Sequence, residues 1–166
     1  MTIRPATPRD LPVLLDIFTA AKAFMVRTGN PHQWREGYPG AALMEEEIAR
    51  GVCYVVEEAG EMVGTFCAIP GAEPTYQVIY DGAWPNDNPY LTIHRLASNG
   101  KAAGVARACF AFCAAKGLPM RADTHADNHV MQHLLQSSGF VRCGIIYTDN
   151  GSPRLAYWRG KKSTPL

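Results

Sequence analysis

Residues 90–106 read YLTIHRLASNGKAAGVA, and this stretch decides how the rest of the chain is interpreted. Tyr90 to Ala97 is rich in apolar and β-branched residues and predicts a strand, which Ser98-Asn99-Gly100 ends in a tight turn. A helix then begins among the small residues Ala102 to Ala106. Free N–H groups at a helix start form an anion site, and small side chains let a phosphate approach the backbone. The alternative, in which these small residues serve packing alone, stays open.

Outward from this stretch, hydrophobic periodicity and turn residues predict a series of strands and helices. We expect strands at residues 2–4, 52–58, 61–69, 90–97, 120–124, 140–147 and 153–159. We expect helices at residues 8–28, 41–50, from just after Gly100 to near Gly117, and through Val130 up to Gly139. Part of residues 70–89 is expected to extend the third strand before a loop. This order predicts a mixed-sheet α/β protein with one domain at residues 1–160 and a flexible tail at 161–166.

Composition bounds the class of protein. With 166 residues, 47% hydrophobic and 19% charged, the chain is expected to fold as one globular domain. The formal net charge of +1 and the lack of a long basic run argue against a nucleic-acid partner. The longest apolar stretch, Ala108 to Ala115, is far shorter than the roughly 20 residues that cross a bilayer, so we expect no membrane span. Five cysteines without a Cys-x-x-Cys pair predict reduced thiols and a cytoplasmic location.

The helix start after residue 100 lacks both the Walker spacing and the Gly-x-Gly-x-x-Gly fingerprint. It resembles the signature of the GNAT superfamily of acetyl-coenzyme A dependent N-acetyltransferases, Gln/Arg-x-x-Gly-x-Gly/Ala, with Lys101 in the first place and Ala106 in the last. A second family element, Asn followed by Gly-Phe, is matched by Asn128 and Gly139-Phe140. The expected order of elements, β-α-α-β-β-β-α-β-α-β-β, is also similar to the GNAT order, with its mostly antiparallel central sheet.

This resemblance implies acetyl-coenzyme A as co-substrate. Strands four and five would splay apart to receive the pantetheine arm, which pairs with the backbone near Leu96. The pyrophosphate would be held at the signature, by Lys101, Ala102, Ala103, Gly104, Val105 and Ala106, with Asn128 as a further cofactor residue. The reaction would be direct attack by an amine on the thioester, with the Leu96 N–H stabilising the oxyanion.

Direct attack requires a base, because an ordinary alkylamine is protonated at neutral pH. The family often places its base at positions that correspond here to Tyr90 and Thr92, neither of which is basic at pH 7. His94 lies on the same strand face by alternation and is our candidate base; Asp81 is a weaker one. Leu135 stands where the family often has a Tyr as general acid, and Cys143 and Tyr147 are possible substitutes.

For the acceptor pocket we select Trp34, Tyr90, Asp81 and His125. Trp34 lies in the loop between the first two helices, which commonly lines the acceptor pocket in GNAT folds; an alternative is that it only fills the core. His125, with Asp123, follows strand five, where a cleft between parting strands is expected. His125, His129 and His133 are spaced by four residues, but we expect no metal site, because no Glu stands at the interior spacing of a zinc hydrolase motif.

We therefore predict a cytoplasmic acyltransferase that acetylates an amine of a small molecule or a peptide. A non-catalytic acyl-coenzyme A binding or sensing domain is the main alternative, because an obvious carboxylate base is missing from strand four and Leu135 replaces the usual acid. A zinc hydrolase is a third hypothesis. The strand after Pro153 leaves a homodimer open.

Overall fold

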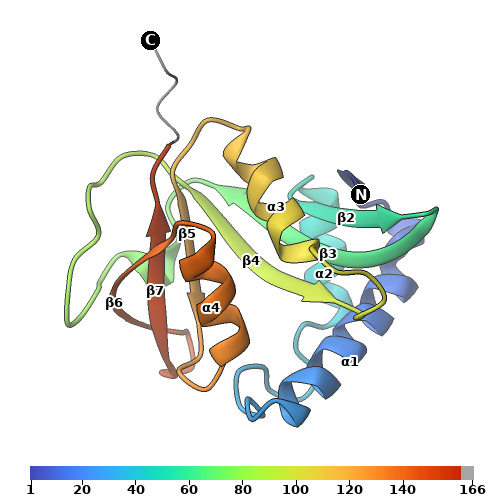
Figure 1. Cartoon of the computed structure of the whole chain (residues 1–166), viewed down its shortest axis with the longest axis horizontal. Helices are drawn as coiled ribbons and strands as arrows, with labels where there is room; N and C mark the ends of the chain where they lie inside the picture. Colours follow the sequence, from blue (N-terminus) through green and yellow to red (C-terminus); the bar gives the residue numbers. More distant parts are fainter. Residues whose placement is uncertain (162–166) are drawn as a thin grey trace.

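A seven-stranded open sheet runs through the computed structural model, which describes residues 1–161 (Figure 1). Its strands are β1 (Thr2–Pro5), β2 (Cys53–Glu58), β3 (Glu61–Pro70), β4 (Leu91–Ser98), β5 (Met120–Thr124), β6 (Val141–Tyr147) and β7 (Pro153–Arg159). Their spatial order is β1-β2-β3-β4-β5-β7-β6, and neighbouring strands are antiparallel except β4 and β5. The fold class predicted from the sequence, a mixed and mostly antiparallel sheet flanked by helices, is confirmed.

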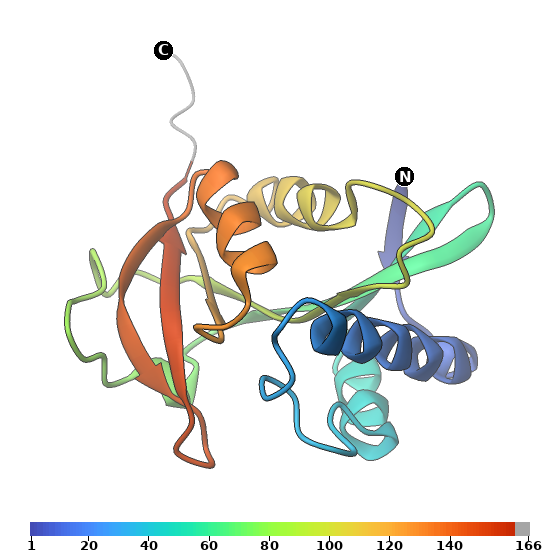
Figure 2. The same cartoon turned by 60° about the horizontal axis from the view of Figure 1, so that its bottom comes forward.

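Helices cover both faces of the sheet. They are α1 (Leu11–Arg27), α2 (Ala41–Ala49), α3 (Val105–Ala114) and α4 (His129–Ser137). α1 and α2 lie on one face and α3 and α4 on the other (Figure 2). Leu14 and Met44 belong to the first apolar layer, and Phe110 and Leu135 to the second. The central strands β3, β4 and β5 are therefore largely buried between the two helical layers.

Several segments differ from the sequence prediction. The helix expected at residues 8–28 begins as a 3-10 helix, η1 (Pro8–Asp10), before α1. α3 begins at Val105 and not directly after Gly100, because the chain passes through turns up to Gly104, whose φ of +90° is left-handed and favours glycine. Residues 70–89 add only Pro70 to β3 and then form a short 3-10 helix, η2 (Pro74–Tyr76). The expected tail begins at Lys161, which is exposed; the rest of it, residues 162–166, lies outside the described residues.

Candidate active site

The parallel strands β4 and β5 form a fork. They are paired only at Leu91 with Met120 and at Thr92 with Arg121. Beyond these two pairs β4 continues to Ser98 without a partner on its β5 side. Backbone N–H and C=O groups that a sheet normally satisfies are thus available inside the protein, which is the arrangement that accepts an extended ligand as an added strand.

A β-bulge lies in β4 at the mouth of the fork. His94 is opposite Cys67 and Ala97 is opposite Thr65, so two residues of β4, Arg95 and Leu96, face a single residue of β3. Arg95 has a φ of +55°, a strained value for a residue with a side chain. The bulge breaks the alternation after His94 and leaves Leu96 without a paired residue on either neighbouring strand.

The bulge is held in place from the α2 side. The buried Arg95 side chain lies 3.4 Å from the Glu47 carboxylate, measured from Nη2, and its Nη1 donates to the Tyr38 hydroxyl at 3.2 Å. Glu47 is itself buried on α2 and also pairs with Arg50 at 3.2 Å. This buried ion pair compensates both charges and fixes the backbone conformation on which the fork depends.

A small pocket of about 130 Å³ lies between α1, the end of β4 and the starts of α3 and α4. Its walls are mostly apolar; they include Ala21, Phe24, Leu96, Ala97, Val105, Ala106, Asn128, Val130, Met131 and Leu134. Within residues 1–161, none of the backbone N–H groups from Ala102 to Ala106 donates to a protein acceptor. An apolar channel that ends at free amides fits the pantetheine arm and the pyrophosphate of coenzyme A.

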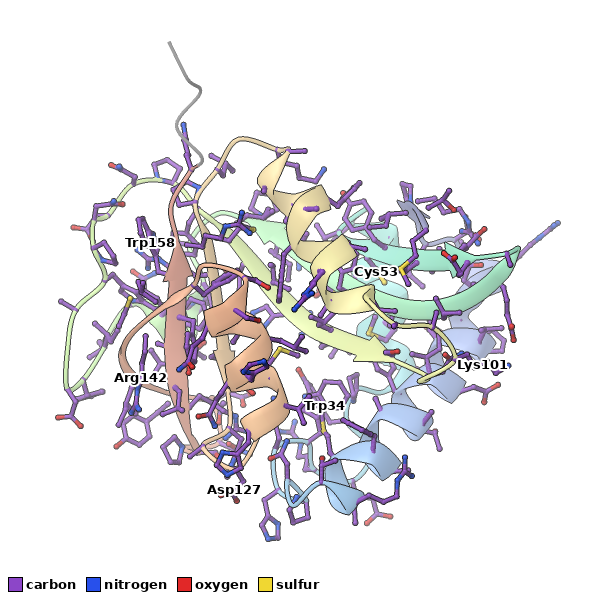
Figure 3. All side chains as sticks on the ribbon, in the orientation of Figure 1. Trp34, Cys53, Lys101, Asp127, Arg142 and Trp158 are labelled. Atoms are coloured by element: carbon purple, nitrogen blue, oxygen red, sulfur yellow. The ribbon has the colours of Figure 1, made fainter. Side chains whose placement is uncertain are left out.

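Lys101 points away from these amides. Its ammonium group pairs with Glu61 on the β2–β3 hairpin, and the side chain projects at the end of β4 (Figure 3). Asn128 lines the pocket, and its Oδ1 accepts from the Met131 N–H at 3.0 Å, which caps α4. Its Nδ2 donates to Gln33 Oε1 at 2.8 Å and so ties the start of α4 to the loop between α1 and α2.

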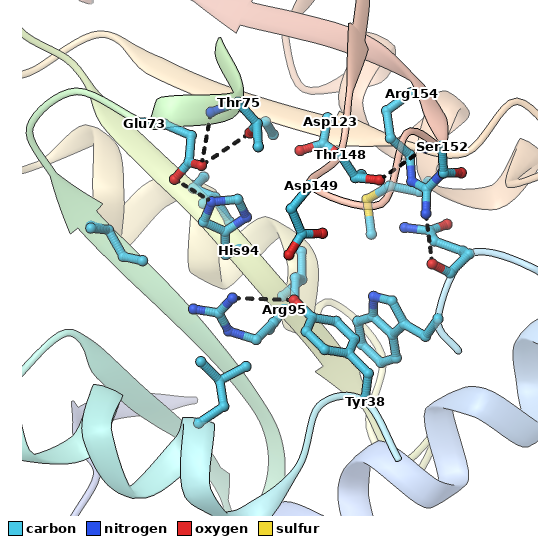
Figure 4. A pocket seen from close by; sticks show the side chains of 18 of the residues that line it. Tyr38, Glu73, Thr75, His94, Arg95, Asp123, Thr148, Asp149, Ser152 and Arg154 are labelled. Carbon is cyan, nitrogen blue, oxygen red and sulfur yellow. Dashed lines mark hydrogen bonds and ion pairs between the residues drawn. The ribbon is translucent and has the colours of Figure 1, made fainter. Parts of the chain in front are cut away.

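A much larger cavity, of about 710 Å³, opens on the other side of the bulge. Segments from much of the chain line it, among them the loop after α1, α2, the start of η2, β4, β5 and the β6–β7 loop (Figure 4). Leu96, Asn128 and Met131 line this cavity and the small pocket alike, so the two spaces adjoin at the bulge.

His94 lies in this cavity as part of a pair that the sequence did not reveal. Its Nε2 is 3.1 Å from Oε2 of Glu73, a residue just before η2. Glu73 also accepts from the Thr75 hydroxyl at 3.0 Å, and its own N–H donates to the Tyr90 hydroxyl at 2.8 Å. The hydrogen bond from His94 outweighs burial and lowers the pKa of Glu73 to about 2. Glu73 is therefore a fixed carboxylate that sets the orientation of the imidazole.

Tyr76 packs against the His94 side of the His94–Glu73 pair. Its ring is centred 6.2 Å from that of His94, and its hydroxyl donates to Asp123 Oδ2 at 2.6 Å. Burial, followed by the Asp123 charge, raises the pKa of Tyr76 well above its usual value. Tyr76 is thus a neutral hydrogen-bond donor that holds Asp123 at the cavity wall.

Of the four residues selected from the sequence for the acceptor pocket, only Trp34 lines the large cavity. Trp34 lines the cavity and also packs edge-on against Phe18, with ring centres 5.8 Å apart, so it fills the core and walls the cavity together. Tyr90 is buried behind Glu73. Asp81 follows Tyr80, which bridges to Ile145 of β6, and does not line the cavity. His125 lies beside the cavity without lining it, and its Nδ1 accepts from the Asp127 N–H at 3.0 Å.

The remaining sequence candidates are also located. Leu135 is fully buried in the α3/α4 layer, and Tyr147 lies on the surface against Tyr80. In the part of the chain that the structure describes, no three His, Cys, Asp or Glu side chains form a group that could hold a metal ion. None of the described helices is both long and apolar enough to span a bilayer.

Comparison with known proteins identifies relatives among solved structures. No protein-family model and no curated protein matches the chain. A GNAT-family acetyltransferase from Streptococcus agalactiae is 33% identical, with 98% of this chain and 96% of that one covered and a TM-score of 0.86. A provisionally named acetyltransferase from Staphylococcus aureus is 26% identical over 96% of this chain and 99% of its own, with a TM-score of 0.71. The ribosomal-protein-S18-alanine N-acetyltransferase of Escherichia coli, 18% identical over 99% of both chains, shares the fold at a TM-score of 0.60.

Proposed function

Because this chain belongs to the GNAT family of acetyltransferases, we propose that it transfers an acetyl group from acetyl-coenzyme A to the amine of a small molecule or a peptide. The observation that carries this proposal is the junction at the bulge. A narrow apolar pocket with free amides and a wide charged cavity share the wall at Leu96. A thioester held on one side would therefore face an amine held on the other.

The residues of the small pocket fit coenzyme A. Backbone N–H groups from Ala102 to Ala106 would donate to its pyrophosphate, and the apolar walls would exclude water from its pantetheine arm. When bound, acetyl-coenzyme A supplies an acetyl thioester. The N–H of Leu96, which has no paired residue in the sheet, would donate to the carbonyl oxygen on which negative charge develops.

In the large cavity, His94 would accept the proton that the acceptor amine must lose before it can attack. Since Nε2 faces Glu73, the imidazole would use Nδ1 for this step. Glu73 would act through His94 as a positioning residue, keeping Nε2–H in its hydrogen bond and the other nitrogen free. Trp34 would form one wall for the acceptor.

The test is thiol release. Purified full-length protein is incubated with acetyl-coenzyme A and a panel of amines, amino acids and short peptides. We expect release that depends on the amine and a product heavier by one acetyl group in the mass spectrum. Binding of acetyl-coenzyme A without release from any amine would instead establish the alternative, a sensing domain. Location in the cytoplasm and a homodimer stay predictions, the first supported by five unpaired cysteines.

A further inference from the structure

A buried arginine of the large cavity forms no ion pair among residues 1–161. Arg154, on β7, is only 6% exposed, and its side chain lies at the cavity wall across from His94 (Figure 4). Its Nη2 donates to the Gln33 carbonyl at 2.7 Å. Its Nη1 donates to the Pro153 carbonyl at 3.0 Å and to the Ser152 hydroxyl. All of these acceptors are neutral, and Arg154 makes no ion pair with any carboxylate of residues 1–161.

Arg95, the other buried arginine at this wall, shows what compensation requires. It lies 3.4 Å from the Glu47 carboxylate, so both charges of that pair are neutralised. Asp123 is the acid whose charge acts on Arg154, but the two form no ion pair, and Asp123 Oδ2 accepts from the Tyr76 hydroxyl at 2.6 Å. Burial lowers the pKa of Arg154 even though the Asp123 charge acts in the opposite direction. A buried cation left in this state is costly unless an anion from outside completes it.

From this contrast we propose that the acceptor is an amino acid or a similar amine that carries a carboxylate, and that Arg154 binds this carboxylate. The proposal rests on the function proposed above and names its substrate class. A planar guanidinium matches a carboxylate well, and one on the wall opposite His94 would hold the acid end while the amine end reaches the base. Asp149, which points into the same cavity in Figure 4, would face the ammonium group on arrival.

The experiment compares α-, β- and γ-amino acids with their primary amides, which keep the size and the amine but remove the negative charge. For wild-type protein we expect kcat/KM to favour the best acid over its amide by at least about tenfold, as for a hydrogen bond to a charged group. An amino acid amide has a less basic amine than the amino acid, so a larger fraction of its amine is neutral at a given pH. Amine basicity would therefore favour the amide and cannot produce a preference for the acid. In Arg154→Gln the ratio of acid to amide should fall to about one, and Arg154→Lys should keep part of it.

A ratio within one variant does not depend on the fraction of molecules that fold. The acid-to-amide ratio therefore separates a role of Arg154 in binding the acceptor from its structural role, the hydrogen bond to the Gln33 carbonyl. Arg121→Gln is the matched control: this arginine is equally buried, stacks on Trp84 and Tyr90, and does not line the cavity, so its ratio should equal that of wild type. Amides that equal or exceed acids in wild type, or a preference that survives Arg154→Gln, would overturn the proposal.

Calorimetric titration of the same acids and amides, with coenzyme A present, separates this proposal from the proposed function. Acids that bind more tightly than amides, lose this advantage in Arg154→Gln and yet release no thiol would support the carboxylate site and contradict the acetyltransferase. Thiol release with amides at least as good as acids would do the reverse. Neither binding nor turnover of any acid would overturn both.

Discussion

The small pocket and the large cavity meet at one bulge, but they are lined by different kinds of chemical groups. The small pocket is lined mainly by apolar side chains of α1, of the end of β4 and the start of α3, and of the start of α4, next to free backbone amides. The large cavity takes polar and charged side chains from distant segments, among them Glu73, His94 and Arg154. Backbone groups can recognise a constant ligand such as coenzyme A, whereas the side chains of the cavity determine which acceptor is used.

The largest expected effect is on the chemical step. His94→Ala should reduce kcat by about 10²- to 10⁴-fold, the usual contribution of a general base, and leave acetyl-coenzyme A affinity unchanged. Turnover should recover partly at higher pH, because more of the amine is then neutral without help. The measurement is a pH profile of kcat with an identified acceptor.

The matched variant is His125→Ala, which removes a histidine beside the cavity that does not line it. It should keep the wild-type profile. If His94→Ala kept wild-type turnover and an identical pH profile, His94 would be structural. The large cavity would then not supply the general base as proposed.

The next effect concerns the small pocket. Gly104→Asp places a negative charge at the start of α3, next to the proposed pyrophosphate site. Two unit charges about 6 Å apart repel each other by about 3 kcal/mol at an effective dielectric constant of about 20. We therefore expect a roughly 100-fold weaker acetyl-coenzyme A complex. Calorimetric titration measures this affinity. Gly117→Asp is the control, since Gly104 and Gly117 have φ values of +90° and +78° and an added Cβ meets no atom within 4 Å at either site.

Both variants place Asp at a glycine with a left-handed φ, but Gly117 follows the far end of α3, away from the proposed pyrophosphate site. Equal affinity in folded Gly104→Asp and Gly117→Asp would show that the amides before α3 do not bind the cofactor.

The smallest effect is on stability. The pKa of Glu73 is lowered from 4.5 to about 2 in the folded protein, so Glu73 stabilises the fold at pH values above 4.5 and this contribution is lost as the pH falls from 4.5 towards 2. Glu73→Gln should therefore lower the free energy of unfolding by about 2 kcal/mol at pH 6, allowing for partial solvent screening, and by little near pH 2. Urea unfolding at several pH values measures the difference.

Glu61→Gln, which removes an exposed carboxylate paired with Lys101, should change stability by less than about 1 kcal/mol. A constant difference between Glu73→Gln and wild type at all pH values would mean that the His94–Glu73 hydrogen bond does not hold this part of the cavity.

The sequence predicted the elements of the fold closely because its signals are local. The hairpin at Ala59-Gly60 and the strand over Met120–Thr124 follow from alternation and turn residues alone, and both are present. The start of α3 was placed too early, because small residues predict a helix start without revealing the left-handed Gly104 that delays it. Enzyme class and fold were also predicted from the spacing of a short motif, and both are confirmed by the relative from Streptococcus agalactiae.

By itself, the sequence determined the strand–turn–helix at residues 90–106 and the face on which His94 lies, since a two-residue alternation and a turn need only near neighbours. Tertiary structure alone decided the bulge at Arg95, because a bulge is defined by the register with β3 and is held by Glu47 from α2. It also decided that Glu73, rather than Asp81, lies beside His94 and that the Arg154 guanidinium donates to neutral oxygens and has no ion pair within residues 1–161. Such facts depend on distances between residues far apart in the chain, and those distances exist only once the sheet has formed.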